Sequence, residues 1–426
     1  MSEEHKELEE EIIQSSNHDV SVFTVLNLSL VTFLVLLGLS MVAPILPAYA
    51  ESFQVSYTLV GFVISSFAIT RMAFDMPAGL LSRKLDKTKI MISGLLLLSV
   101  SSILAGFAPN YITLIIARMI EGAGSALYVT TATVYLAQIS GQEKRGQWMS
   151  LYMGMLLLGA IFGPTFGGII ADTYDIRAPF FAYAIITGLA VIPTLTLPKL
   201  ANSRNVTSPL ELKEIFRDMR QVLSHPSFLL VTFTVFTTFF LRTGVRTTLV
   251  PLFAANNLGL NSVAIGLVLT IGAITTAITI VPMGGISDRI GRKIPLALCL
   301  ILTAVVVLLI PLSTDILTLS IVIALYGAVI GLSGPSAAYV TDVSPQDKLE
   351  ISMGLYRMIS DFGYVVGPLL LGFLADVTAT PVAGESHSGL IGVFPFVVAS
   401  IILIAAFFIL LKADDPVKDN NQISTE

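Results

Sequence analysis

Charge-free stretches of at least 20 residues recur along this chain, among them 22–50, 90–117, 146–171, 178–197, 221–241, 247–287, 294–314, 316–341 and 389–411. A helix needs about 20 mostly apolar residues to cross the hydrocarbon core of a bilayer. The whole chain is 54% hydrophobic and only 12% charged, which excludes ordinary soluble folds. The sequence therefore predicts an all-α, polytopic integral membrane protein.

Glycine, proline, asparagine and charge clusters divide these stretches into about twelve expected crossings. We expect helices near residues 22–49, 57–82, 90–107, 111–138, 147–171, 178–199, 227–253, 262–287, 294–312, 316–341, 350–375 and 389–411.

Basic residues in the short loops predict the orientation of the chain. They collect on one side, in the loops near residues 83–89, 144–145, 289–293 and 348 and in the central linker, whereas the opposite side has only Arg177. By the positive-inside bias, both termini and the linker are expected in the cytoplasm. The acidic start of the chain is unlike a signal peptide, so residues 1–20 are expected to remain as a tail. We expect a multi-pass protein of the cell membrane.

The residues offer little for a cofactor or for catalysis. The single cysteine, Cys299, cannot close an intrachain disulfide, and no cysteine and histidine spacing suggests a metal. No phosphate-binding loop for ATP is present in the sequence. We therefore expect no enzyme activity, no cofactor and no nucleic-acid partner. Work done by such a chain must use an ion or substrate gradient, or a separate subunit.

An internal repeat organises the chain into two halves. The loop signatures that begin at Gly79 and Gly284 lie 205 positions apart, and the Gly-Pro patterns that begin at Gly159 and Gly363 lie 204 apart. Parallel repeats of this kind place a substrate site near the membrane midplane, between the halves. We predict six-helix bundles at 21–199 and 227–412, joined by a cytoplasmic linker at 200–226 and flanked by cytoplasmic tails at 1–20 and 413–426.

These motifs resemble the major facilitator superfamily. The loop GGISDRIGRK at 284–293 resembles the family's cytoplasmic loop signature, and its resemblance assigns a gating role to Gly79, Gly284, Asp288, Arg289, Gly291 and Arg292. In the first copy Arg83 stands where the family has aspartate. The fourth span, with Arg118, Glu121 and Gly122, resembles the family's membrane-arginine signature. The resemblance implies two six-helix bundles around a central cavity, in a monomer.

The fifth span narrows the resemblance to one branch. Its pattern of small residues is similar to that of twelve-helix drug:proton antiporters, and it consists of Gly159, Gly163, Pro164, Gly167 and Gly168. Small residues at spacing four commonly serve helix packing alone. The alternative is a hinge or seal between the halves.

Acidic side chains inside the spans are candidates for proton coupling, because intramembrane charges usually face a partner or a wet cavity. Asp75 is the first candidate, since Arg71 four residues earlier and Pro77 two residues later lie beside it. Burial favours a neutral carboxyl and a nearby guanidinium favours a charged one. Glu121 with Arg118, and Asp361, are further candidates. The competing interpretation is mutual neutralisation within Arg71/Asp75, Arg118/Glu121 and Arg357/Asp361.

Arg242 and Arg246 differ because the seventh span contains no acid. They either pair across the bundle with Asp75, Glu121 or Asp361, or form an electropositive site for an anionic substrate. The predicted residues of the substrate cavity are Arg71, Arg242, Arg246, Arg357, Phe239 and Tyr356.

The sequence thus predicts a secondary active transporter that works by alternating access and exports small organic molecules or drugs in exchange for protons. An importer or exchanger of an organic anion is the first alternative. A receptor that keeps the fold without transport is the second.

Overall fold

The computed structural model describes residues 22–140, 145–200, 212–381 and 389–415. Eleven of the helices in these ranges are long and apolar enough to cross a membrane, and Phe394–Leu410 is a shorter apolar helix. Each of them overlaps one of the twelve expected crossings. The predicted tail at 1–20 lies outside the described residues.

The first half of the chain contains six spans. Its helices are α2 (Val22–Val42), α3 (Leu46–Glu51), α4 (Tyr57–Lys84), α5 (Lys87–Gly106), α6 (Tyr111–Ile139), α7 (Arg145–Thr173), α8 (Ala178–Leu189) and α9 (Val191–Leu195). The last two helices together form the sixth span.

The second half repeats this order after the linker helix α10 (Leu212–Leu223). Its elements are α11 (Pro226–Leu241), the π-helix η1 (Arg242–Leu249), α12 (Val250–Asn256), α13 (Ser262–Ile290), α14 (Lys293–Leu309), η2 (Ile310–Leu312), α15 (Ile316–Gly331), α16 (Ser336–Asp342), η3 (Gln346–Lys348), α17 (Leu349–Thr378), β1 (Thr380–Pro381), β2 (Gly389–Leu390) and α18 (Phe394–Leu410). The two short strands pair antiparallel, with Thr380 opposite Leu390.

The linker helix α10, the π-helix η1, the short 3-10 helix η3 and the strands β1 and β2 were not predicted from the sequence. The charged side of α10 contacts the second half, where Asp218 forms an ion pair with Lys348 at 3.5 Å.

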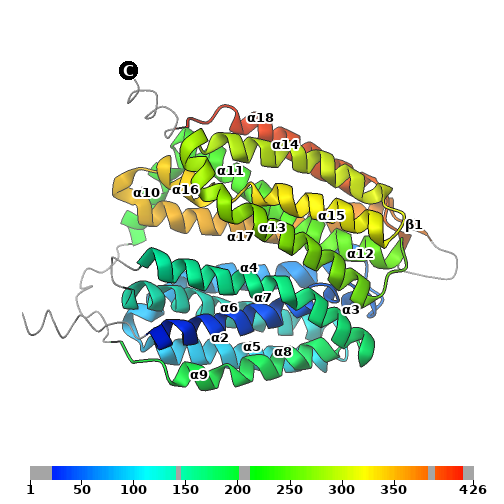
Figure 1. Cartoon of the computed structure of the whole chain (residues 1–426), viewed down its shortest axis with the longest axis horizontal. Helices are drawn as coiled ribbons and strands as arrows, with labels where there is room; N and C mark the ends of the chain where they lie inside the picture. Colours follow the sequence, from blue (N-terminus) through cyan, green and yellow to red (C-terminus); the bar gives the residue numbers. More distant parts are fainter. Residues whose placement is uncertain (1–21, 141–144, 201–211, 382–388, 416–426) are drawn as a thin grey trace, which may run out of the picture.

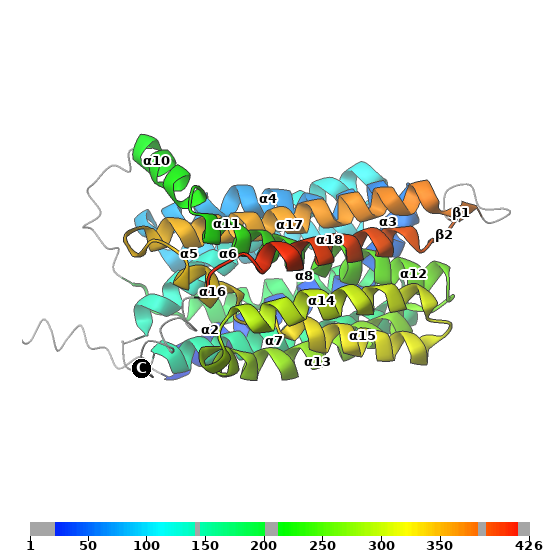
Figure 2. The same cartoon turned by 90° about the horizontal axis from the view of Figure 1, so that it is seen from above.

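The helices form two bundles that lie one above the other in Figure 1. Helices α2 to α9 make one bundle and α11 to α18 the other, and the bundles meet mainly where α4 packs on α17 and α7 on α13. Figure 2 shows these two pairs along opposite sides of the molecule. Helix α2 begins and helix α18 ends at the same end of the molecule, which we call the terminal end; the opposite end, where α3 and the strands lie, is the far end.

An aspartate of the second half caps a helix of the first half at the far end. Ser56 precedes α4 but its side chain makes no cap. Asp376 of α17 instead accepts hydrogen bonds from the backbone N–H groups of Tyr57, at 2.6 Å, and Thr58, at 2.8 Å. It also accepts one from the Thr58 hydroxyl. The first N–H groups of a helix have no partner within the helix, so this contact satisfies them across the boundary.

The repeat places the same contact on the opposite side of the molecule. Asp172 of α7 accepts hydrogen bonds from the N–H groups of Ser262, at 3.1 Å, and Val263, at 3.3 Å, which begin α13. Asp172 and Asp376 lie 204 positions apart, the offset of the Gly-Pro patterns. We call these two contacts the aspartate caps.

Close backbone approach accompanies each cap. A Cβ added to Gly61 would lie 2.2 Å from the Pro368 carbonyl oxygen, and one added to Gly266 would lie 2.3 Å from that of Pro164. Nearer the terminal end, Gly154 and Gly284 face open space, since a Cβ added to either would meet no atom of the described residues within 4 Å. The halves are therefore closed against each other at the far end.

Candidate functional site

A cavity of about 170 Å³ lies between the two halves, and side chains from both halves line it. One part of the lining is apolar and the other part carries charges and hydroxyl groups. The lining residues are Leu39, Val42, Ala43, Leu46, Ile64, Phe67, Ala68, Arg71, Arg118, Thr243, Thr247, Asp361 and Tyr364. Of the residues predicted to be functional, Arg71, Arg118 and Asp361 are in this lining. The others that line it were missed, although Thr243 and Thr247 adjoin Arg242 and Arg246 in sequence.

Arg71 connects the two halves at this cavity. Its guanidinium Nη2 lies 3.4 Å from Oδ1 of Asp361 on α17, and its Nε lies 3.9 Å from Oδ2 of Asp75 on its own helix. The other oxygen of Asp75 accepts a hydrogen bond of 2.9 Å from the Thr130 hydroxyl on α6. One arginine is thus shared between an acid of each half.

The intrahelical pair expected between Arg357 and Asp361 is not formed. Asp361 is buried and faces Arg71 across the boundary, whereas Arg357 is exposed and has no ion pair among the residues that the structure describes. A spacing of four puts two side chains on one helix face, but the partner on another helix decides which way each one turns. The interpretation that these two residues neutralise each other, one of the two left open by the sequence, is therefore wrong for this pair.

Arg118 and Glu121 form a buried ion pair on α6. Their exposed fractions are 5% and 1%. The guanidinium of Arg118 also lies over the ring of Phe67, 4.9 Å from its centroid. The Arg118 Nε and the Glu121 Oε1 have no hydrogen-bond partner within the described ranges. The pair is therefore neutralised but incompletely hydrogen-bonded.

Arg242 and Arg246 lie on the π-helix η1, in the middle of the seventh span. The three acids with which they were expected to pair are engaged elsewhere, by Arg71 and Arg118. Arg246 donates a hydrogen bond to the Leu269 carbonyl at 3.2 Å, and neither arginine has an ion pair within the described part of the chain.

Two predicted aromatic residues lie next to the cavity but do not line it. Phe239 packs edge-on against Tyr364, which does line it, with ring centroids 5.1 Å apart. Tyr356 is half-buried on α17, and its electrostatic neighbours include Arg357 and Arg242.

The glycines of the fifth span divide between packing and the contact of the halves. A Cβ added to Gly159, Gly163 or Gly167 would come within 2.7 Å of a carbonyl oxygen of α2, in the same half. One added to Gly168 would lie 2.3 Å from the Ser262 carbonyl oxygen, in the other half, and the Pro164 carbonyl faces Gly266. The packing interpretation fits the first three, and the seal fits Gly168 and Pro164.

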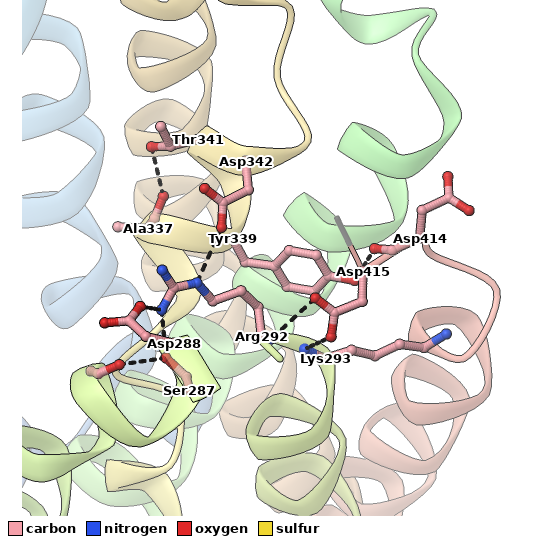
Figure 3. A network of polar contacts seen from close by, with 11 residues as sticks. Ser287, Asp288, Arg292, Lys293, Ala337, Tyr339, Thr341, Asp342, Asp414 and Asp415 are labelled. Atoms are coloured by element: carbon pink, nitrogen blue, oxygen red, sulfur yellow. Dashed lines mark hydrogen bonds and ion pairs between the residues drawn. The ribbon is translucent and has the colours of Figure 1, made fainter. Parts of the chain in front are cut away.

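The loop signature at 284–293 builds a polar network at the terminal end, shown in Figure 3. Arg292 contacts Asp288 at 2.5 Å, Asp342 at 3.1 Å and the Ser287 hydroxyl at 2.6 Å. Asp415 accepts hydrogen bonds from the N–H groups of Arg292 and Lys293, at the start of α14. All these residues belong to the second half. Gly79 of the first copy lies apart, against the Thr130 methyl group.

Asp288→Ala is expected to slow transport severalfold, because it breaks the ion pair with Arg292 in the loop network. Substrate affinity should not change, because this ion pair lies outside the cavity. An exposed ion pair contributes at most about 1 kcal/mol, so the fold survives. Arg289→Ala is the matched comparison and is expected to have a smaller effect, since Arg289 is exposed and has no ion pair among the described residues. Initial transport rates and substrate binding in purified protein measure both; equal rates in Asp288→Ala and the parent would contradict the prediction.

Gly291→Ala is expected to destabilise the protein by about 1–2 kcal/mol. The φ angle of Gly291 is 93°, a conformation that residues with a Cβ rarely adopt, and an added Cβ would lie 2.3 Å from the Asp415 carboxylate. Thermal unfolding in detergent measures the change. Gly285→Ala serves as the control, because a Cβ there would meet nothing within 4 Å.

Comparison with known sequences identifies the family. The model of the Major Facilitator Superfamily matches residues 28–253 and, a second time, residues 231–426. Multidrug resistance protein 2 of Bacillus subtilis is 24% identical over 85% of this chain and 91% of its own length. The quinolone resistance protein NorA of Staphylococcus aureus is 24% identical over 81% of this chain and 88% of its own. An uncharacterised MFS-type transporter of Methanocaldococcus jannaschii is 27% identical over 81% and 89%.

Solved structures have the same fold. The nucleoside transporter NupG superposes with a TM-score of 0.77 at 13% identity, over 91% of this chain and 99% of its own. A bacterial homologue of the human lysosomal transporter Spinster, in an inward-facing, unoccupied conformation, superposes with a TM-score of 0.73 at 15% identity, over 93% and 95%. Together with the cavity between two repeated bundles, these matches show that the chain is a multi-pass secondary transporter and belongs to the Major Facilitator Superfamily.

Proposed function

We propose that this transporter exports small organic molecules in exchange for protons, by alternating access. The observation that carries the proposal is the shared position of Arg71 between Asp75 of the first half and Asp361 of the second. Protonation of either acid would remove one of the two attractions on Arg71. A proton would then change how strongly the halves hold together at the cavity, which is what coupling requires.

The structure shows one state of the cycle. The halves touch at the far end. If the terminal end is cytoplasmic, as the basic loops predict, the halves are closed toward the outside, a state that both an exporter and an importer pass through. The relatives named for multidrug and quinolone resistance support export.

Proton movement in proteoliposomes tests the proposal. Purified protein is reconstituted with a trapped pH dye and challenged with a panel of cationic, neutral and anionic compounds. We expect at least one compound class to drive proton movement, and we expect Asp75→Asn and Asp361→Asn to reduce it at least tenfold. Asp175→Asn, an exposed far-end acid, is the control.

Two results would count against this mechanism. Labelled compounds that equilibrate without any proton movement would indicate a uniporter or an anion exchanger. Full proton movement in both Asp75→Asn and Asp361→Asn would show that the coupling group lies elsewhere.

Import or exchange of an organic anion is the second candidate. Arg242 and Arg246, without a carboxylate partner among the described residues, favour it. Accumulation of a labelled carboxylate inside inward-uptake vesicles, driven by external acid, would support this alternative over export.

A further inference from the structure

We propose that Arg242 and Arg246 bind an anionic group of the transported molecule, so that the substrate is an amphipathic organic anion or zwitterion. This inference rests on the proposed function only in that the chain carries a small organic molecule through the cavity. It assigns the substrate class and is independent of proton coupling.

The charges around the cavity do not balance. Arg71 faces Asp75 and Asp361, and Arg118 faces Glu121, which uses all three acids of the membrane interior near the cavity. Arg242 and Arg246 then add two positive charges. The electrostatic neighbours of Arg246 are Arg242, Tyr326 and Tyr364, with no carboxylate among them. A guanidinium held in a membrane without a counter-ion is costly, and a bound anion would supply the missing charge.

Among the residues that the structure describes, few acceptors use the hydrogen-bonding capacity of these arginines. A guanidinium has five N–H donors, and the structure gives Arg246 one acceptor, the Leu269 carbonyl at 3.2 Å. Its side chain is half-buried. Two arginines on one helix match the two oxygens of a carboxylate or the oxygens of a sulfonate or phosphate.

The π-helix brings the arginines to the boundary between the halves. η1 packs against α4 of the first half and α17 of the second. The hydroxyls of Thr247 and Thr248 bond to carbonyls five residues earlier, at 3.2 and 2.9 Å, as the wider π turn requires. Single π turns inside α-helices occur frequently at functional sites. Thr243 and Thr247 of η1 line the cavity, whereas Arg242 and Arg246, next to them in sequence, are not among its lining residues.

The cavity offers a matching surface for the remainder of such a molecule. Its lining from α2, α3 and α4 is mostly apolar, through Leu39, Val42, Leu46, Ile64 and Phe67. Tyr364 joins the two regions, because it lines the cavity and neighbours both Arg71 and Arg246 electrostatically. A molecule with an apolar body and a single anionic group would place its body against the apolar lining and its anionic group near the arginines.

Three probes with one fluorophore and different charges test the inference. Dansylglycine carries a carboxylate, dansylamide is neutral and dansylcadaverine carries an ammonium group. Binding to the purified full chain is measured by the change in dansyl fluorescence. We expect dansylglycine to bind at least tenfold more tightly than either of the others, because a charge-assisted hydrogen bond contributes about 1.5–3 kcal/mol.

Variants connect that preference to the arginines. Arg246→Gln and Arg242→Gln are each expected to reduce the affinity for dansylglycine at least tenfold and to leave dansylamide binding unchanged. Arg246→Lys keeps the charge and is expected to retain part of the preference, which separates lost recognition from lost folding. Arg177→Gln, at an exposed far-end arginine, is the control. Equal binding of all three probes, or a preference that survives in both Gln variants, would overturn the inference.

The outcomes separate this inference from the proposed function. If dansylcadaverine drives proton movement and dansylglycine does not bind, proton-coupled export stands and the anion site is wrong. If dansylglycine binds through Arg246 without proton movement, the anion site stands and proton coupling is wrong.

Discussion

Replacing Asp172 and Asp376 together by alanine is expected to shift the transporter roughly thirtyfold toward a state open at the far end. Each aspartate satisfies two N–H groups at the start of a helix in the opposite half. Loss of a helix cap costs about 1 kcal/mol, so two caps amount to about 2 kcal/mol in the closed state. In a state open at the far end, water can reach these N–H groups, so the substitutions cost that state little free energy.

The caps act on the equilibrium between states because they join the two halves. An ordinary cap stabilises its helix in every state of the protein. Asp376 lies on α17 and caps α4, and Asp172 lies on α7 and caps α13, so both contacts must break whenever the halves separate at the far end. Beside each cap the backbones also approach closely, Gly61 at Pro368 and Gly266 at Pro164, so separation of the halves breaks these packing contacts as well.

The distance between spin labels at Tyr174 and Leu312 measures the shift. Both side chains are exposed at the far end, one in each half, and Cys299→Ala removes the single native cysteine. We expect the ratio of the longer-distance to the shorter-distance population to rise about thirtyfold in the double variant. Transport should slow as well, because the state closed at the far end is less populated during the cycle.

Asp315→Ala is the matched control. Asp315 caps α15 within its own half, accepting hydrogen bonds from Leu317 and Thr318 at 2.8 and 2.9 Å. The hydrogen bond from Thr318, followed by that from Leu317, lowers the pKa of Asp315, so it is also a charged cap at neutral pH. Its loss should lower stability without changing the label distance. An unchanged distance in the Asp172/Asp376 variant would show that the caps do not set the equilibrium.

The sequence predicts the spans well because each one is a local property of about 20 residues. The π-helix could not be predicted, because the sequence from Arg242 to Leu249 has no feature that distinguishes it from an ordinary segment of an apolar α-helix. The repeat predicted that Gly168 and Gly372 occupy equivalent places, but not that Asp172 and Asp376, four residues after each, would cap the other half. That contact depends on how two bundles meet.

The ion pairs illustrate the same limit. Arg118 and Glu121 are three apart on one helix and do pair, as their spacing allows. Arg357 and Asp361 have an equally suitable spacing and do not pair, because Arg71 of the other half competes for Asp361. Spacing within a helix shows which contacts are possible. The packing of the halves decides which of them form.

Glu121→Ala is expected to destabilise the protein by about 3–5 kcal/mol, because it leaves the buried guanidinium of Arg118 without its counter-ion. The double variant Arg118→Met/Glu121→Met should recover much of that loss, since it removes both charges and fills the space with apolar atoms. Thermal unfolding in detergent measures both. Equal stability of the single and double variants would show that the unpaired charge of Arg118 is not what destabilises Glu121→Ala.

Transport by the same double variant separates the two interpretations of Arg118. If Arg118 only balances the charge of Glu121, a stable protein without either charge should transport at a rate near that of the parent. If Arg118 acts on substrate or proton in the cavity that it lines, the double variant should be stable and transport should fall at least a hundredfold. We expect the second result, because Arg118 lines the cavity between the halves and its guanidinium lies over the ring of Phe67, which lines the same cavity.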